Sequence, residues 1–344
     1  MPASHQPEQS PRVILIGASS GGTEALDEVV AGLPSELRAA VFIVRHVPGD
    51  SVNYLPQLLQ GRSGLPVRLA ADHDRIEAGT IYIAPSDRHL LIDADQMYLG
   101  RGPRENRARP AVDPLFRSGA LAHGPRAIGV VLSGLLDDGS AGLIAIKRSG
   151  GIAIVQDPDD ALCPDMPHNA LRHVEADHCL PAAEIGPALA ELVSADPPQH
   201  ALLPELPELQ EGWRREVAIQ LQGSGAVGTA VELGEQVPAS CPECGGPLWK
   251  MQDGVLRFRC HTGHALTALH LAEGFEHAAE TALWAALRVL DERARMLRRM
   301  AERDGERGYL RSQAMFAERA QDAERHVDTL RKVLNLFPSN DPAG

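Results

Sequence analysis

The chain has 344 residues, 44% hydrophobic and 23% charged, which is enough for two or three folded domains and too apolar for full disorder. A formal net charge of -13 and an aromatic content of 4% argue against nucleic-acid binding, which needs basic and base-stacking surfaces. The sequence has no apolar run of membrane-spanning length and no secretory signal pattern at its start. We therefore expect a cytoplasmic protein without membrane insertion.

Short apolar runs alternate with amphipathic stretches over residues 12–195. Runs rich in β-branched residues and bounded by Gly, Pro or Asp predict buried strands at 13–17, 40–46, 79–85, 127–134 and 151–157. Residues 23–33 and 138–150 predict helices, and residues 90–100 predict a strand pair or hairpin. Repeated strand–helix–strand units predict an α/β domain with a doubly wound, mostly parallel, Rossmann-like sheet. Ligands of such sheets bind beyond the carboxyl ends of the strands.

The remaining chain divides by composition. Residues 1–11 predict a disordered tail, and residues 196–238 predict an acidic, Pro-rich linker. More than half of the net charge comes from residues 184–240, which hold nine acidic residues and two arginines. Residues 239–266 contain a Cys/His segment, and the apolar spacing of residues 267–337 predicts an α-helical hairpin with a turn at 305–308. The hairpin closes on itself or on a second chain, as in a homodimer.

A serine pair follows the first predicted strand. In VILIGASSGGTEAL (13–26), Ser19 or Ser20 stands where the strand ends and a helix begins. The helix N-terminus offers N–H donors to a developing oxyanion, which suits a nucleophile. A nucleotide-binding turn would need G-x-G-x-x-G, and a hydrolase elbow would need G-x-S-x-G; this stretch has neither. The small residues alone are also compatible with a plain tight turn.

Candidate partners of the serine follow two other buried strands. His46 ends the second strand, and Asp137 and Asp138 follow the strand at 127–134. Because these strand ends meet at one edge of a parallel sheet, serine, histidine and aspartate are expected to converge. His89 and His168 are rival bases on other loops. Asp138 could instead serve as the N-cap of the following helix.

These residues together carry a resemblance to a family. The segments IGASSGGTEAL, RHVPGDS, GTIYIAPSDRHLLI, RPAVDPLFRS, VVLSGLLDDGSAGL and IVQDPDDALCPDMPHNAL occur in order over the first 195 residues. This part of the chain resembles the catalytic domain of chemotaxis protein-glutamate methylesterases of the CheB type. The resemblance implies a catalytic triad of Ser19, His46 and Asp138, with oxyanion donors at the backbone amides near Ser20 and Leu135.

The resemblance also implies a chemistry and a partner. Ser19 would attack a glutamate γ-methyl ester of a methylated chemoreceptor or related signalling protein, releasing methanol. The same triad would also serve glutamine deamidation, and no cofactor is expected for catalysis. The chain departs from the family pattern in two ways. Leu135-Leu136 stands where the family has Met-Gly. Only about 12 residues precede the first strand, so we expect a form without a phospho-receiver domain.

The Cys/His segment has the spacing of a metal site. Cys241-x2-Cys244 and Cys260-x3-His264 are separated by 15 residues, and Gly residues follow closely in both knuckles. The pattern predicts a zinc-ribbon-like module with a structural zinc, and His261 is an alternative fourth ligand. Three clustered cysteines out of five favour a local site in a reduced compartment over a disulfide framework. Free cysteines in a small β-module are the alternative.

Three functions remain in competition. The first is an esterase acting on methylated glutamate. The second is a catalytically weak or inactive signalling adaptor that binds partners through the zinc module and the helical hairpin. The third, a zinc-dependent regulator of nucleic acid, is disfavoured by the charge.

Overall fold

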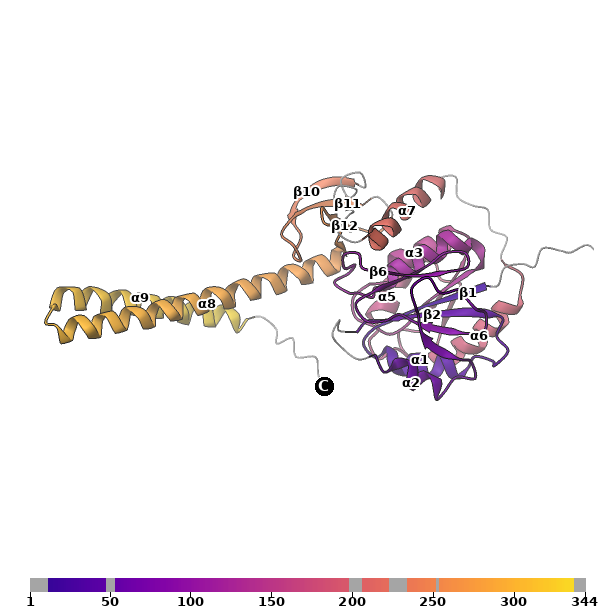
Figure 1. The fold of residues 1–344 in the computed structure, drawn as a ribbon, viewed down its shortest axis with the longest axis horizontal. Coiled ribbons are helices and arrows are strands. Elements are labelled where there is room, and N and C mark those ends of the chain that lie inside the picture. The colour runs from indigo at the N-terminus through magenta and orange to yellow at the C-terminus, as the bar shows by residue number, and fades with distance from the viewer. Residues whose placement is uncertain (1–11, 48–52, 198–205, 223–233, 252–253, 337–344) are drawn as a thin grey trace, which may run out of the picture. The chain divides into compact units, whose positions relative to one another are not determined.

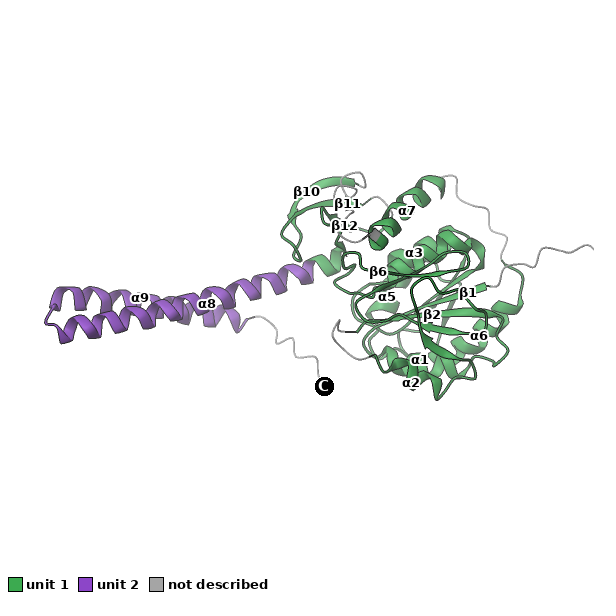
Figure 2. Cartoon of the chain, viewed as in Figure 1, with its two compact units in different colours: residues 1–271 green, residues 272–344 purple. Residues whose placement is uncertain are grey.

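A computed structural model of the chain describes residues 12–47, 53–197, 206–222, 234–251 and 254–336 (Figure 1). The predicted tail at 1–11 lies outside the described residues. The chain separates into two compact units, residues 1–271 and residues 272–344, which Figure 2 colours separately. No described helix combines the length and the apolar character needed to cross a membrane.

The first unit is built on a seven-stranded sheet in the order β3-β4-β2-β1-β7-β8-β9, and every neighbouring pair is parallel. The strands are β1 (Arg12–Ala18), β2 (Ala39–Arg45), β3 (Val67–Leu69), β4 (Ile81–Ile83), β7 (Ala127–Val131), β8 (Ile152–Gln156) and β9 (His178–Leu180). The prediction of a doubly wound, mostly parallel sheet is confirmed. Each predicted strand coincides with an observed one, whereas the short edge strands β3 and β9 were not predicted.

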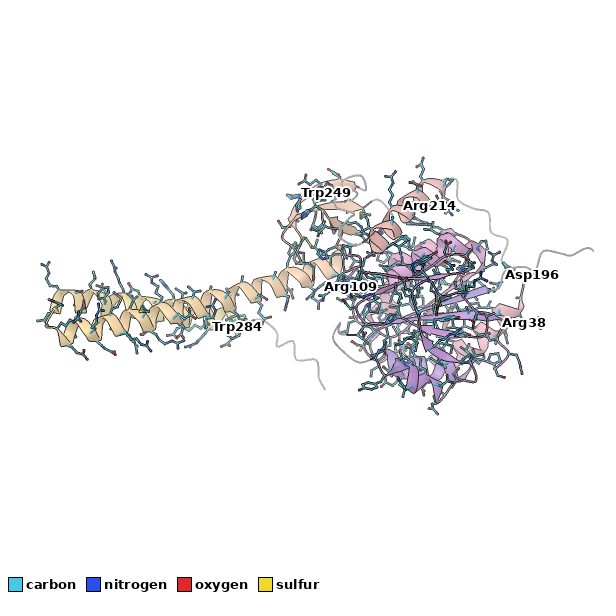
Figure 3. The ribbon with its side chains drawn as sticks, in the orientation of Figure 1. Arg38, Arg109, Asp196, Arg214, Trp249 and Trp284 are labelled. Atoms are coloured by element: carbon cyan, nitrogen blue, oxygen red, sulfur yellow. The ribbon has the colours of Figure 1, made fainter. Side chains whose placement is uncertain are left out.

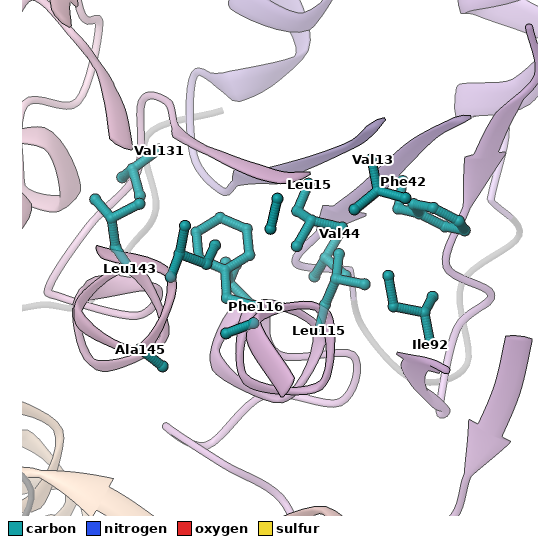
Figure 4. Packing of buried hydrophobic residues seen from close by; sticks show 14 of the residues in the cluster. Val13, Leu15, Phe42, Val44, Ile92, Leu115, Phe116, Val131, Leu143 and Ala145 are labelled. Carbon is teal, nitrogen blue, oxygen red and sulfur yellow. The ribbon is translucent and has the colours of Figure 1, made fainter. Parts of the chain in front are cut away.

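Helices cover both faces of this sheet. One face carries α1 (Gly22–Ala31), α2 (Leu55–Gln60) and α6 (Ala182–Ser194), and the other carries α3 (Val112–His123), α4 (Ser140–Arg148) and α5 (Asp165–His173). Strand β1 contributes side chains to the hydrophobic cores on both faces of the sheet. Ile14 and Ile16 pack on the first face, and Val13 and Leu15 pack on the second. Figure 4 shows Leu15 among side chains that include Leu115 and Phe116 of α3. A continuous apolar strand therefore fits here, since both faces are buried.

The predicted hairpin at 90–100 is present as β5 (His89–Ile92) paired antiparallel with β6 (Met97–Gly100). A 3-10 turn, η1 (Gly124–Arg126), follows α3. We refer to residues 12–195 as the α/β domain.

The predicted linker is wrong over part of its length. Residues Leu206–Gln222 form helix α7, which packs against α3. Its Trp213 and Ile219 are buried, and so is the charged Glu216. The acidic composition of 196–238 indicated a connector, although part of the segment is a helix with one buried face. The Pro and Glu residues behind that prediction lie mainly at the N-terminal end of α7 and on its exposed side.

A four-stranded antiparallel sheet follows, made of β10 (Gly234–Ser240), β11 (Pro247–Met251), β12 (Arg257–Cys260) and β13 (Ala265–Thr267). We call residues 234–267 the Cys/His module. Its small core contains Cys241, Leu248, Cys260, Leu266 and the following Leu271. A core of this size is small for independent stability, so a metal or a neighbouring domain has to add to it.

The second unit is a helical hairpin. Helix α8 (Ala268–Glu306) begins in the first unit and continues into the second, where α9 (Leu310–Leu334) runs beside it (Figure 1). Arg298 of α8 pairs with Glu324 of α9 at 2.5 Å, so the hairpin closes within the chain. The buried residues follow the predicted apolar spacing and include Ala294, Ala320, Ala323 and Val327. Trp284, labelled in Figure 3, is exposed.

Candidate active site and metal site

The ends of β1 and β2 place a serine beside a histidine. Ala18 faces Arg45 in the parallel register, so Ser19 and His46 are the next residues of the two strands. The Ser19 amide donates to Ser133 O at 2.9 Å, and the His46 amide donates to Ala18 O at 3.1 Å. Gly134 lies so close that a Cβ there would meet Ser19 Cβ at 2.7 Å. Only glycine fits this close approach, which fixes Ser19 against the loop after β7.

The three residues form a continuous hydrogen-bonded chain. His46 Nδ1 lies 3.1 Å from Ser19 Oγ, and His46 Nε2 lies 2.7 Å from Asp138 Oδ2. A carboxylate accepts, so Nε2 carries the imidazole proton and Nδ1 is left to accept the serine hydroxyl. In chymotrypsin, Nε2 faces the serine and Nδ1 faces the aspartate. The two ring nitrogens of His46 have exchanged these positions.

Asp138 is held as a charged group. It is fully buried, and its two oxygens accept hydrogen bonds from the amides of Val112 at 2.7 Å and Gly139 at 3.0 Å, among others. Burial alone would raise the pKa of Asp138, but the hydrogen bond and charge of His46 and these donors outweigh it and lower the pKa to about 2. The carboxylate can therefore orient and stabilise an imidazolium at neutral pH.

An open pocket of about 370 Å³ adjoins these residues. Its lining includes Ser19, Ser20 and His46 together with two cationic side chains, Arg45 and Arg107. The side chain of His46 is 20% exposed, so a substrate can reach the imidazole, whereas the Asp138 side chain has no solvent exposure. Neither arginine stands without an acidic neighbour, since Arg107 lies 3.8 Å from Glu243 and Arg45 has Glu24 nearby.

The two predicted oxyanion donors differ in their placement. Ser20 is exposed and lines the pocket, whereas Leu135 is exposed but does not belong to the lining. No described residue accepts a hydrogen bond from either amide. Leu136, the next residue, has a φ of 63°. Its carbonyl accepts from Asn169 Nδ2 at 2.7 Å, which holds this strained residue in place.

The rival histidines do not contact Ser19 among the described residues. His89 is buried, with Nε2 bonded to Pro103 O at 3.0 Å, and burial lowers its pKa to about 4. His168 is exposed on α5. Of these three histidines, His46 is the one that the described residues place within hydrogen-bonding distance of Ser19.

A second cluster gathers in the Cys/His module. The ligand atoms of Cys241, Cys244, Cys260 and His264 all lie within 4.8 Å of one another. Sγ of Cys244 and Sγ of Cys260 are 3.6 Å apart, and Cys260 Sγ is 3.5 Å from His264 Nδ1. A tetrahedral zinc with Zn–S of about 2.3 Å and Zn–N of about 2.0 Å needs edges of about 3.8 and 3.6 Å, so the four groups fit it.

The alternative ligand His261 faces elsewhere. Its ring lies over Gly246, where a Cβ would meet His261 Nδ1 at 2.0 Å. Gly245 and Gly263, one in each knuckle, have φ angles of 73° and 98°. Side chains rarely adopt this conformation, so glycine allows both turns to close around the sulfur atoms.

Sequence reasoning missed several side chains behind the triad. Asn106 Nδ2 donates to Asp138 Oδ1 at 2.8 Å and to Asp113 Oδ2 at 3.0 Å. Burial and the neighbouring Asp138 raise the pKa of Asp113 to about 8, so the two carboxyl groups are pushed apart in pKa. Asp113 lies within the quoted RPAVDPLFRS segment, but nothing in that segment indicated a contact with Asp138.

The module and the α/β domain share a set of buried charges, which we call the buried ion cluster. Arg117 of α3 pairs with Glu105 at 3.0 Å, and Arg257 of β12 pairs with Glu216 of α7 at 3.0 Å. Arg259 bonds to Glu105 at 2.9 Å and also to Glu216. All five side chains are at most 2% exposed. Burial would raise the pKa of Glu105, but Arg117 and Arg259 hold it well below its ordinary value.

Known proteins resemble the α/β domain. A protein-glutamate methylesterase/protein-glutamine glutaminase from Methanosarcina mazei is 38% identical over 189 residues, which cover 53% of this chain and 52% of the relative. One from Anaeromyxobacter dehalogenans is 40% identical over 185 residues, covering 53% and 51%. The chain thus spans about half the length of the curated relatives it matches.

A solved structure and a family model agree with these relatives. The crystal structure of the Thermotoga maritima CheB methylesterase catalytic domain is matched over 99% of its length and 53% of this chain, with 33% identity and a TM-score of 0.52. The family model described as CheB methylesterase matches residues 14–189, which is just over half of the chain. The chain therefore belongs to the CheB methylesterase family.

Proposed function

We propose that the protein is a protein-glutamate methylesterase that hydrolyses glutamate γ-methyl esters with Ser19, His46 and Asp138. The observation that carries the proposal is the unbroken chain of contacts, 3.1 Å from Ser19 Oγ to His46 Nδ1 and 2.7 Å from His46 Nε2 to Asp138 Oδ2. The names of the relatives support the same chemistry, with glutamine deamidation as a second activity of the same site.

The reaction follows from the positions of the protons. Ser19 Oγ attacks the ester carbonyl while His46 Nδ1 takes its proton, and the other imidazole proton stays on Nε2, hydrogen-bonded to Asp138. The amides of Ser20 and Leu135 would stabilise the oxyanion. His46 returns the proton to the leaving methanol. Water then hydrolyses the acyl-serine in the same way and leaves a glutamate carboxylate and a proton. With glutamine, ammonia leaves in place of methanol.

The partner is proposed to be a methylated chemoreceptor or a related signalling protein. The names of the relatives support this kind of partner, and the open pocket beside Ser19 and His46 leaves room for an extended side chain. The helical hairpin offers a further binding surface, and a homodimer through it stays a prediction that sedimentation of the full chain would test.

The test compares two neighbouring serines. Membranes carrying methyl-labelled chemoreceptors are mixed with wild type, Ser19→Ala and Ser20→Ala, and released methanol is measured. We expect Ser19→Ala to lose a factor of roughly 10³ or more, because the nucleophile is gone. Ser20→Ala keeps the backbone amide and should stay close to wild type. Equal release by wild type and Ser19→Ala would refute the esterase. Tight receptor binding without release would favour the adaptor.

We also propose that Cys241, Cys244, Cys260 and His264 hold a structural zinc. Four protein ligands complete a tetrahedron and leave no open position, so the metal would stabilise the fold and take no part in hydrolysis. Metal content of Cys241→Ser is compared with that of Cys179→Ser, which alters an exposed cysteine of β9. We expect about one zinc per chain in the control and a large loss in Cys241→Ser. Full zinc in both variants would contradict the ligand set.

A further inference from the structure

Asn106 occupies a central place behind the triad. Among the described residues, the side chains of His46 and Asn106 donate hydrogen bonds to Asp138. Asn106 Nδ2 lies 2.8 Å from Asp138 Oδ1. It is 5% exposed, and the same amide group donates to Asp113 Oδ2. The remaining donors to Asp138 are backbone amides, those of Val112, Asp113 and Gly139. The orientation of one carboxamide therefore matters for how Asp138 meets His46.

The Cys/His module fixes that orientation. The backbone amide of Thr267 donates to Asn106 Oδ1 at 3.1 Å. Since the amide oxygen is taken by an N–H, the NH2 group must point to the carboxyls. The module also holds the Asn106 backbone, whose N–H donates to Ala265 O at 2.8 Å, while the Ala265 N–H returns a bond to Arg104 O at 3.2 Å. Residues 104–106 thus pair with the edge of β13.

A second contact reaches the residue before Asp138. Thr267 Oγ1 donates to Asp137 Oδ1 at 2.6 Å, and His270 Nδ1 lies 2.8 Å from the same oxygen. All three side chains are at most 5% exposed. The module and the first turn of α8 therefore hold both the loop that carries Asp138 and the turn that carries Asn106.

The contacts lie directly beside the candidate metal ligands in the chain. Ala265 follows His264, and Arg259 of the buried ion cluster precedes Cys260. The Cys260 amide donates to His264 O at 2.9 Å, so the ligand loop closes on itself just before β13. Binding a metal restricts this loop, and the restriction passes to Ala265 and Thr267 without any intervening flexible segment.

We propose that Asn106 is a positioning residue for Asp138 and that the Cys/His module, when metal is bound, holds Asn106 in its working orientation. The proposal rests on the esterase function and adds to it a form of control within the chain. The module acts on the triad from behind and does not need to touch the substrate.

Two perturbations should have the same consequence. Asn106→Ala removes the donor and keeps the metal ligands, whereas a chelator removes the metal and keeps Asn106. Each should lower kcat roughly 10- to 100-fold, the range seen when a supporting hydrogen-bond partner is lost, and leave KM for the methylated receptor unchanged. Because both act on one contact, chelation of Asn106→Ala should cause little further loss.

The experiment also needs a readout that involves no substrate. The His46 Nε2 proton shared with Asp138 is followed by its downfield proton NMR resonance in the full chain. We expect the resonance in the zinc-loaded wild type, and its loss or shift in the metal-free protein and in Asn106→Ala. Asn335→Ala, at the exposed end of α9, controls for loss of an asparagine.

The outcomes separate the two proposals. An unchanged resonance and kcat after zinc removal would refute the role of the Cys/His module in positioning Asp138. The same conclusion would follow if chelation lowered kcat by the same factor in wild type and in Asn106→Ala. A resonance that responds to zinc in a protein that releases no methanol would support the positioning role and refute the esterase. If chelation unfolds the protein, as circular dichroism would show, Asn106→Ala with bound zinc decides by itself: a normal resonance and kcat would overturn the proposal.

Discussion

The edge of the parallel sheet and the buried ion cluster both remove charged groups from water, yet they do so in opposite ways. At the sheet edge, Asp138 is surrounded by neutral donors and one imidazole. In the cluster, Glu105 and Glu216 face three guanidinium groups, those of Arg117, Arg257 and Arg259. A carboxylate held by neutral donors stays available to stabilise a proton arriving on His46. A carboxylate paired with arginine instead stabilises the packing of the Cys/His module and α7 against the α/β domain.

Replacing Asp138 by Asn should break the first arrangement with the largest effect. The amide would present N–H to donors and favour the wrong imidazole tautomer, so we expect kcat for methanol release to fall roughly 10⁴-fold. Asp177→Asn is the matched control, since Asp177 pairs with Lys147 at the surface and lies outside the site. Activity within tenfold of wild type in Asp138→Asn would mean that the imidazole is oriented by something else.

Replacing Arg259 by Met should break the second arrangement. The side chain is fully buried and bonds to both carboxylates of the cluster, which would lose these charge-assisted hydrogen bonds and keep only Arg117 and Arg257 as cationic partners. We expect a loss of about 3–5 kcal/mol in the free energy of unfolding, measured by denaturant titration. The control is Arg62→Met, whose exposed pair with Asp27 should contribute at most about 1 kcal/mol. Similar losses in the two variants would show that burial adds nothing to the pairing.

The two regions also differ in how far their sequence predicts them. Ser19, His46 and Asp138 each follow an apolar strand, and parallel strands end at one edge, so the local pattern was enough to bring them together. The clustering of Cys241, Cys244, Cys260 and His264 was predicted for a similar reason, because both knuckles are short and local. The strand pattern also predicted the parallel sheet and the hairpin at 90–100.

The buried ion cluster could not be predicted in this way. Its members come from four separate segments, and each charged residue taken alone reads as a surface residue. Glu216 was read as part of a linker because the segment 196–238 is acidic and its first part is rich in Pro and Glu. Asn106 has no pattern at all around it, since its role arises from contacts 32 and 161 residues away along the chain.

A buried histidine gives a smaller and pH-dependent effect. His89 accepts the Ala111 amide at Nδ1 and donates from Nε2 to Pro103 O, so it fits only as a neutral ring. Its pKa is lowered to about 4 mainly by burial, and the unfolded chain binds the extra proton more readily. Stability is therefore complete above about pH 6.5 and is lost as the pH falls toward 4.

This effect is measurable before most carboxyl groups titrate. Between pH 7 and pH 5, His89 should cost the wild type about 2 kcal/mol of unfolding free energy. His89→Gln should show a correspondingly flatter pH dependence, whereas His73→Gln, at an exposed position, should match the wild type. Parallel curves for wild type and His89→Gln would show that the ring is not held neutral.

The smallest expected effect lies at Leu136, in the loop between β7 and α4. A leucine at φ 63° costs about 1–2 kcal/mol relative to the right-handed region, whereas glycine adopts this angle freely but loses about 0.5–1 kcal/mol through the flexibility of its unfolded chain. Leu136→Gly should therefore change the unfolding free energy by no more than about 1 kcal/mol, toward higher stability. Leu136→Ala keeps the strained Cβ and loses side-chain packing, so it should be less stable than both. If Ala and Gly were equally tolerated, the positive φ would not be what this position demands, and the Asn169 bond to the Leu136 carbonyl would be the feature that shapes the loop behind Ser19.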